Sequence, residues 1–186
     1  LPLRLWTMLY TTVMRGVPDL VMMLLVFYGG QVLLNVVIDH FGWDFIEIDP
    51  FVAGVLTIGL IFGAYFTETF RGAFLAVSAG QLEAGRAYGM SAWQVFRRIL
   101  FPQMLRFALP GIGNNWLVLL KSTAIVSMIG LSDMTRIADQ AGRSTHQPFT
   151  FYLAVCVLYL AMTALSSYGL GLLMRRYSAG VRETQV

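Results

Sequence analysis

The stretch QLEAGRAYGMSAWQVFRRILFP (residues 81–102) is the least hydrophobic long segment of a very hydrophobic chain. Its charged side chains are Glu83, Arg86, Arg97 and Arg98. Its apolar residues recur at helical spacing, at Met90, Trp93, Phe96 and Leu100. Such spacing is typical of an amphipathic helix. The segment therefore has an apolar face that either lipid or a protein partner must cover.

Composition indicates that the surrounding solvent is largely lipid. The 186 residues are 57% hydrophobic and only 12% charged, with a mean hydropathy of +0.67. Soluble domains carry roughly a quarter charged residues. The lone cysteine, Cys156, lies in an apolar run, which excludes a disulfide framework or a cysteine metal cluster. The length fits a single domain.

Four hydrophobic runs are long enough, with a few flanking residues, to cross a bilayer, which takes about 20 residues of helix. They cover residues 20–38, 51–66, 108–131 and 149–174. The sequence therefore predicts an all-α integral membrane protein with four spans. Because the chain begins at Leu1 rather than methionine, we expect it to be a fragment of a longer chain with about five spans.

The arginines predict the orientation. If all four runs span, segments 1–19, 67–107 and 175–186 share one side, and segments 39–50 and 132–148 share the other. Ten arginines fall on the first side: Arg4, Arg15, Arg71, Arg86, Arg97, Arg98, Arg106, Arg175, Arg176 and Arg182. The second side has only Arg136 and Arg143. Cytoplasmic loops carry the excess of basic residues, so segment 81–102 is predicted to be cytoplasmic.

Local signals divide that segment into two short helices. Residues 81–88 can form the first, and Gly89 is expected to end it, because glycine is common just past a helix C-terminus. Ser91 and Gln94 match a capping box, which predicts a second helix over residues 92–100.

Pro102 is expected to end this second helix, because the residue before a proline disfavours helical geometry. The result is a helix–turn–helix on the cytoplasmic face. Two interpretations of it stay open at this point. It is either an amphipathic element lying on lipid headgroups or a docking element for a cytoplasmic protein.

The pattern E-A-x(4)-G-x(9)-I-x-x-P, formed by Glu83, Ala84, Gly89, Ile99 and Pro102, resembles the EAA loop of ABC-importer permeases. Further stretches resemble the polar-amino-acid permease family, in particular the Q-type membrane subunit of the histidine and lysine/arginine/ornithine uptake systems of Gram-negative bacteria. They are RGVPDLVMMLLVFYG (15–29), GAYFTETFRGAF (63–74), FRRILFPQMLRFALPGIGNNW (96–116) and LKSTAIVSMIGL (120–131). Gly85 departs from the family pattern, which usually has alanine there, and is expected to loosen the first helix by up to about 1 kcal/mol.

The resemblance implies a type I ABC-importer transmembrane domain over residues 1–186, truncated at its N-terminus, with residues 81–102 as its coupling-helix loop. In this family the loop sits in a cleft of the ATP-binding subunit. Gly89 would be the hinge, Glu83 would contact the partner or cap the helix, and arginines such as Arg97 would brace the docked surface.

The resemblance also implies the partners and the cargo. The partners would be a dimer of ABC ATPase subunits, a homologous second permease subunit, a periplasmic amino-acid-binding protein and the lipid of the bacterial inner membrane; a nucleic acid is not among them. The cargo would be histidine, lysine, arginine or ornithine, or alternatively another polar amino acid or an opine.

The chain shows no energy source and no catalytic centre of its own. It has no G-x-x-x-x-G-K-[ST] phosphate-binding loop, so we expect no bound cofactor, and ATP would be used by the partner subunit. His40 and His146 fall in predicted external loops, and no catalytic or metal-binding spacing involves them. Two rival classes remain at this level: an ATP-independent channel or secondary transporter, and a membrane scaffold.

Polar residues inside the spans are candidates for the substrate path, because such groups are costly in lipid and usually face the bundle interior. Asp19 follows Pro18 at the predicted cytoplasmic end of the first run, where a carboxylate attracts a cationic side chain or interacts with the helix dipole. Glu68 lies three residues before Arg71, so an ion pair is the simpler interpretation than substrate contact.

The third run carries three more candidates. Lys121 lies centrally in it, and a structural or gating role is favoured over substrate choice. Asn114 and Asn115 follow a Pro-Gly pair and would either line the path at an interrupted helix or cap its broken backbone. The first run has a polar stripe that is expected to join helices: Tyr28, Gln31 and Asn35.

Overall fold

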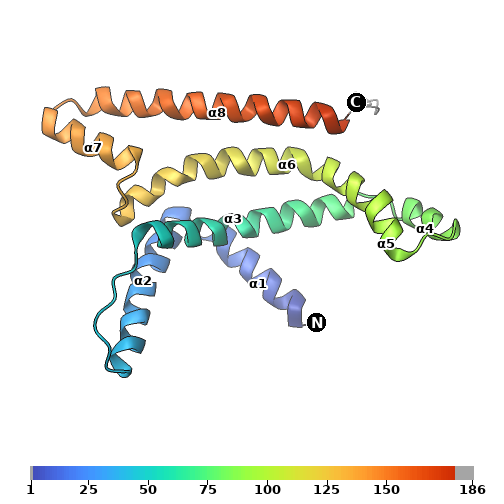
Figure 1. Ribbon diagram of the computed structural model, residues 1–186, viewed down its shortest axis with the longest axis horizontal. Helices are drawn as coiled ribbons and strands as arrows, with labels where there is room; N and C mark the ends of the chain where they lie inside the picture. Colours follow the sequence, from blue (N-terminus) through green and yellow to red (C-terminus); the bar gives the residue numbers. More distant parts are fainter. Residues whose placement is uncertain (1, 179–186) are drawn as a thin grey trace. The chain divides into compact units, whose positions relative to one another are not determined.

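The computed structural model describes residues 2–178, and its regular elements within that range are all helical (Figure 1). In chain order they are α1 (Pro2–Gly16), α2 (Asp19–His40), α3 (Pro50–Leu75), α4 (Ala79–Ala87), α5 (Ala92–Val95), the π-helical turn η1 (Phe96–Leu100), α6 (Phe101–Ser122), the 3₁₀ segment η2 (Thr123–Ile129), α7 (Met134–Thr145) and α8 (Pro148–Ser178). Leu1 and residues 179–186, with Arg182 among them, lie outside the described residues.

The four predicted spans are confirmed by the lengths and hydropathies of the helices. The segments long and apolar enough to cross a membrane are Asp19–His40, Pro50–Leu75, Ala92–Ile129 and Pro148–Tyr177. Many large apolar side chains on them are exposed, including Leu33 at 69%, Leu160 at 63% and Leu165 at 74%. An apolar surface of this kind is normal where lipid or other membrane helices surround a chain.

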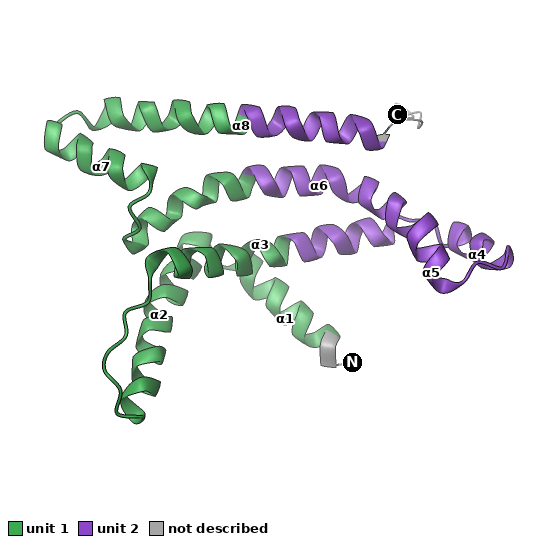
Figure 2. Ribbon diagram, viewed as in Figure 1, with its two compact units in different colours: residues 1–65, 118–163 green, residues 66–117, 164–186 purple. Residues whose placement is uncertain are grey.

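The chain divides into two compact units (Figure 2). The first contains residues 1–65 and 118–163. Its buried core is formed by Met23, Ala53, Val126 and Ile129. These residues come from α2, α3 and η2, so the N-terminal turns of α2 pack against the start of α3 and the 3₁₀ segment. Close packing is possible because Gly54 faces Val126: a Cβ on Gly54 would lie 2.9 Å from the Val126 Cγ1.

The second unit contains residues 66–117 and 164–186. Its buried core joins the last turns of α3 to the first turns of α6, through Ala73, Val77, Met104 and Ala108. Leu82 of α4 and Leu100 of η1 pack against the same cluster. The segment of residues 81–102 is therefore attached to this core by its own side chains.

Helix α1 does not match its expected location. The Tyr10 hydroxyl donates a hydrogen bond to the Leu60 carbonyl, and the Arg15 guanidinium lies 5.4 Å from the centre of the Tyr65 ring. Leu60 and Tyr65 belong to the middle of α3, which is one of the candidate spans. These contacts do not fit the expectation that the whole of segment 1–19 lies in the cytoplasm. Pro18 then separates α1 from α2, because proline has no N–H to continue a helix.

Candidate functional site

The helix–turn–helix predicted over residues 81–102 is present, and Gly89 ends its first helix as expected. Gly89 has φ +80°, a left-handed conformation that favours glycine. The Met90 N–H donates to the Gly85 carbonyl at 3.1 Å, and the Gly89 N–H donates to the Arg86 carbonyl at 2.9 Å. This pair of bonds is the Schellman motif, which satisfies the last carbonyls of a helix. The turn is therefore fixed by backbone geometry that other residues rarely adopt.

The capping box is also confirmed. The Gln94 N–H donates to the Ser91 hydroxyl oxygen at 3.3 Å, and the Ser91 N–H donates to the Gln94 side-chain oxygen at 2.8 Å. Without these bonds, the two backbone N–H groups would have no acceptor within the helix, because they lie at its N-terminus. Ser91 and Gln94 thus define where α5 begins.

The expectation that Pro102 ends the second helix is wrong. The chain stays helical from Ala92 through α6, and the turn before the proline, η1, widens to a π-helix. Here the Phe101 N–H reaches the Phe96 carbonyl, five residues back. A wide turn makes room for a proline ring and accommodates the missing N–H. The rule on residues before proline is overridden by this local rearrangement.

Gly85 has a packing role that the sequence did not reveal. It is buried, and a Cβ added there would lie 2.6 Å from Cδ1 of Ile99 and 3.4 Å from Cγ2 of Val95. Instead of only loosening α4, Gly85 lets η1 approach it closely. Ile99, predicted as an ATPase-coupling residue, is half-buried and turned toward Gly85. Its contact within the loop therefore holds the two short helices together.

The remaining coupling candidates lie on the outer surface of the loop. Glu83, Ala84, Arg97 and Pro102 are exposed. Glu83 lies within α4 and Ser78 is the residue that precedes the helix, so Glu83 does not cap it. Trp93, expected on the uncovered apolar face, is 65% exposed, and Tyr88, which sequence reasoning did not single out, is 88% exposed. Since a large exposed tyrosine and tryptophan are common anchors at interfaces, the loop presents a surface that is suited to a protein partner.

Asp19 occupies a different place from the one expected. Its carboxylate accepts a hydrogen bond from the Ser122 hydroxyl at 3.4 Å. Ser122 is the last residue of α6, and the arginine-rich loop adjoins the first residue of that helix. Asp19 therefore lies at the end of α6 away from the loop, and the prediction that it marks the cytoplasmic end of the first run is wrong. The error arose because α1, which precedes it, is a helix beside α3.

Glu68 behaves as the simpler interpretation predicted. The Arg71 guanidinium binds its carboxylate, with an Nη2–Oε2 distance of 2.6 Å and an Nε–Oε2 distance of 2.9 Å. The pair spans three residues of α3, the spacing at which helix neighbours face each other.

The expected interruption at Pro110 and Gly111 is absent, because α6 continues through both residues. Gly111 instead allows close approach of α3: a Cβ there would lie 2.7 Å from Cγ2 of Thr69. Four residues on, the Asn115 amide donates to the Thr69 hydroxyl at 2.9 Å. Asn115 is half-buried in this contact, whereas Asn114 is exposed. The two asparagines thus have different surroundings.

Lys121 lies in the last turn of α6 and not at the centre of a straight span. It is exposed, and no carboxylate of the described residues lies within ion-pair distance of it. The chain then tightens into η2. Its neighbour Ser122 is the residue that contacts Asp19.

Two members of the polar stripe on α2 hold a loop instead of another helix. The Ile48 N–H donates to the Gln31 side-chain oxygen at 2.7 Å, and the Ile46 N–H donates to the Asn35 side-chain oxygen at 3.0 Å. Both amides also donate back to the Ile46 carbonyl. The expectation that the stripe joins helices is therefore wrong for Gln31 and Asn35, and Tyr28 is 56% exposed.

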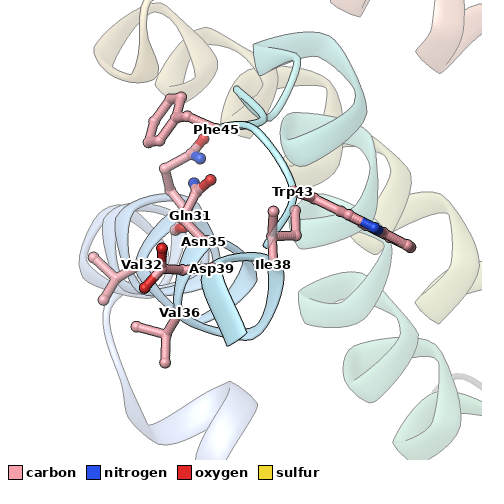
Figure 3. A pocket seen from close by; sticks show the side chains of 8 residues that line it. All are labelled: Gln31, Val32, Asn35, Val36, Ile38, Asp39, Trp43 and Phe45. Carbon is pink, nitrogen blue, oxygen red and sulfur yellow. The ribbon is translucent and has the colours of Figure 1, made fainter. Parts of the chain in front are cut away.

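These bonds fold the extended chain between α2 and α3 back along α2. An open groove lies beside them, and Figure 3 shows Gln31 and Asn35 turned toward the chain segment that carries Phe45, with Trp43 further along it. An extended segment has no internal hydrogen bonds, so its backbone groups need such partners. We call α2 from Gln31 onward together with this loop the outer hairpin.

A family of transport proteins matches almost the whole chain. Its model, described as "Binding-protein-dependent transport system inner membrane component", covers residues 2–179. The chain belongs to this family. It is therefore the membrane-spanning component of a transport system, and the ATPase of such systems is a separate subunit, so the permease itself is not an enzyme. Membership decides against the channel and scaffold alternatives.

Named relatives of the permease are similar to it along most of their length. It is 57% identical to the histidine/lysine/arginine/ornithine transport system permease protein HisQ of Salmonella typhimurium. The matched 177 residues are 95% of this chain and 78% of that protein. It is 45% identical to the octopine transport system permease protein OccQ of Rhizobium meliloti, over 93% of this chain and 73% of that one.

Solved structures agree on the fold. The permease resembles a chain from the crystal structure of an amino acid ABC transporter with histidines, with a TM-score of 0.78, 36% identity and coverage of 94% of this chain and 77% of that chain. A chain of the inward-facing MetNI methionine ABC transporter gives a TM-score of 0.68 at 19% identity, covering 90% and 72%. The expected type I ABC-importer transmembrane fold is thereby confirmed.

Proposed function

We propose that the permease imports basic amino acids across the bacterial inner membrane, driven by ATP and dependent on a periplasmic binding protein. The observation that carries the proposal is the 57% identity to HisQ over 95% of the chain. The assembly would contain this chain, a homologous second permease subunit, two copies of an ABC ATPase subunit and the binding protein.

Residues 81–102 dock the permease onto the ATPase in this proposal. The exposed side of the loop supplies Glu83, Arg97, Tyr88 and Trp93. The buried side is fixed by Leu82 and Leu100, which pack on the core of α3 and α6. A rigid surface element that is packed on the spans transmits displacement to them. This property distinguishes a coupling element from a helix that merely rests on lipid.

The transport cycle follows from that attachment. Closure of the ATPase dimer on ATP pulls the loop, the attached ends of α3 and α6 move, and the cavity between the permease subunits opens outward. The binding protein then releases its amino acid, and hydrolysis restores the inward-facing state. Gly89 and the capping box keep the loop rigid during the movement, because both of its short helices have satisfied ends.

Asp19 is the residue that we propose for contact with the cationic side chain of the cargo. Asp19 is half-buried, and the side-chain hydrogen bond of its carboxylate within the described part of the chain is a long one, from Ser122 at 3.4 Å. A carboxylate beside a membrane path attracts an ammonium or guanidinium group. For Glu68 the ion pair with Arg71 is the simpler interpretation, and Lys121 would repel a cation.

A second candidate cargo is an opine. The octopine permease of Rhizobium meliloti is 45% identical, and the nopaline permease NocQ of Agrobacterium fabrum is 47% identical over 90% of this chain. Octopine and nopaline still carry the amino and carboxylate groups of an amino acid, and they differ in the substituent attached. The same fold therefore fits either cargo class.

Competition in proteoliposomes tests the proposal. The complete transporter takes up radiolabelled L-arginine with its binding protein outside and ATP inside. Excess lysine, ornithine or histidine should reduce the signal, while octopine and glutamine should not. If octopine competes and lysine does not, the cargo is an opine.

A further inference from the structure

A polar pocket in the first unit lies between η2, α7 and the start of α8. Its lining is Ser127, Met128, Thr135, Arg136, Asp139, Gln140, Arg143 and Tyr152. None of these residues belongs to the coupling loop or to the candidate substrate path. Because α7 follows the end of α6 that is away from the loop, the expected orientation places this pocket on the external side.

Arg136 brings a positive charge to the pocket and is in no ion pair among the described residues, although its charge acts on Asp139 nearby. Its guanidinium is half-buried and donates through Nη1 to the Ser127 carbonyl at 3.1 Å. The ion pairs of the described residues join other side chains, Arg71 to Glu68 and Arg143 to Asp139. Among the described residues this is the side-chain bond found for Arg136, and it goes to a neutral carbonyl, so a half-buried guanidinium keeps further N–H donors that can bind an anion.

Asp139 supplies the opposite charge a short way along the same helix. Its carboxylate accepts hydrogen bonds from Arg143 Nε at 3.1 Å and from the Tyr152 hydroxyl at 2.9 Å. The Arg143 hydrogen bond, followed by that of Tyr152, lowers the pKa of Asp139 below its ordinary value. The carboxylate is therefore ionised at neutral pH, and its position is fixed by two neighbours.

Thr135 adds an unsatisfied group next to these charges. Its hydroxyl oxygen is buried and has no hydrogen-bond partner among the described residues. Buried hydroxyls are nearly always paired, and an exception calls for an explanation such as a bound ligand or water. The pocket thus offers three groups close together on α7. They are a guanidinium outside any ion pair of the described residues, an ionised carboxylate held by Arg143 and Tyr152, and a hydroxyl without a hydrogen-bond partner among the described residues.

We infer that this pocket binds the α-carboxylate and α-ammonium groups of an amino acid. Arg136 receives the carboxylate, Thr135 bonds to the same end, and Asp139 faces the ammonium group. The inference rests on the proposed function only in taking the cargo to be an amino acid. Such a site recognises the α-carboxylate and α-ammonium groups that all amino acids share, whereas Asp19 would contact the side chain of the cargo.

Equilibrium binding of tritiated L-arginine tests the site. The complete transporter, with both permease subunits and the ATPase, is held in lipid nanodiscs without the binding protein, and agmatine, which lacks the carboxylate, is the competitor. Wild type should prefer arginine to agmatine. Arg136→Gln should raise the Kd for arginine about tenfold or more, as expected for a lost hydrogen bond to a charged group, and should remove that preference. Arg175→Gln, in the last turn of α8, is the matched control and should leave both unchanged.

An unchanged arginine Kd in Arg136→Gln would overturn the inference. In that case, a weaker response of the ATPase to the binding protein in the same variant would assign Arg136 to protein docking. If Arg136→Gln does not assemble, Thr135→Val decides: the site predicts several-fold weaker arginine binding, and unaltered binding contradicts it.

A neutral amino acid separates this inference from the proposed cargo. Should the wild type bind tritiated L-glutamine and not arginine, the assignment to basic amino acids fails. Loss of that glutamine binding in Arg136→Gln would still support the pocket, because the groups it recognises are the same.

Discussion

Gly85 in α4 lies directly against Ile99 in η1, so close that a Cβ on Gly85 would stand 2.6 Å from the Ile99 Cδ1. This contact fixes the angle between the two short helices of the coupling loop. The approached atom is the end of a flexible side chain, whereas Val95 and Met90 lie at ordinary contact distances of 3.4 and 3.6 Å. Substitution of Gly85 by a small residue should therefore affect uptake far less than substitution by a large one.

Gly85→Ala should be nearly neutral, and Gly85→Leu should abolish uptake. Alanine raises helix propensity by about 1 kcal/mol, which offsets a rotation of the Ile99 terminal methyl that costs about 0.5–1.5 kcal/mol. Leucine has no space between α4 and η1. ATP-dependent uptake in proteoliposomes, with membrane insertion checked by fractionation, measures the difference. Normal uptake by Gly85→Leu would mean that the two helices do not pack as described.

Glu83→Lys and Gly89→Asp should each abolish ATP-dependent uptake without preventing membrane insertion. The first reverses a charge on the exposed face, and the second places a side chain at φ +80°, where an L-residue is strained by about 1–2 kcal/mol. Co-purification of the ATPase is the direct readout. Glu47→Lys, an exposed glutamate of the outer hairpin, is the control and should retain the ATPase.

Asn115→Ala should lower the thermal stability of the purified permease, and Asn114→Ala should not. Asn115 bonds to Thr69 at 2.9 Å, and polar contacts between membrane helices contribute about 0.6 kcal/mol on average. Asn114 is exposed and serves as the matched control. Gly111→Val should be more severe, because its side chain would enter the space of Thr69 and overpacking costs about 1–3 kcal/mol. Equal melting temperatures for the two asparagine variants would contradict the α3–α6 contact.

Each of the two amide side chains in the outer hairpin should protect one backbone N–H from hydrogen exchange. Gln31→Ala removes the acceptor of the Ile48 N–H, and Asn35→Ala removes that of the Ile46 N–H. Hydrogen exchange at the corresponding amide should accelerate about fivefold, since a neutral hydrogen bond contributes about 1 kcal/mol. Exchange resolved by residue distinguishes the two. Acceleration at neither amide would show that the loop is not held by these side chains.

The link between α7 and α8 should weaken only in acid. Hydrogen bonds from Arg143 and then Tyr152 lower the pKa of Asp139. A lowered folded-state pKa contributes stability that is present above the unfolded value of about 3.9 and is lost as the pH falls through the folded value. Melting temperatures of wild type should therefore show an Asp139-dependent fall below about pH 4, and Asp139→Asn should lack it. An Asp139-dependent change of melting temperature between pH 5 and 8 would contradict the lowered pKa of Asp139 in the folded protein.

The sequence was sufficient for features set by local chemistry. Hydrophobic run length predicted the spans, and Gly89, Ser91 and Gln94 predicted the turn and the cap, because each acts through neighbouring backbone groups. The Glu68–Arg71 pair followed from helix spacing alone.

Features that depend on distant contacts were not predictable. The proline rule failed at Pro102 because η1 widens before it. Asp19 was misplaced because nothing in the sequence shows that α1 lies along α3 or that Ser122 is a neighbour. The pocket of Arg136 and Asp139 was also missed, since it needs α7 and α8 in place.

The central claim is that residues 81–102 are held by an ATPase on the cytoplasmic side, and cross-linking at Tyr88 tests it most directly. Tyr88 is the most exposed of the large hydrophobic side chains in the described loop, at 88%. It is replaced by a photoreactive amino acid in cells that express the whole transporter. The account predicts a cross-link to the ATPase subunit, which weakens when Glu83→Lys is added. A Tyr88 position that labels only from the periplasm, or that never cross-links to the ATPase, would contradict it.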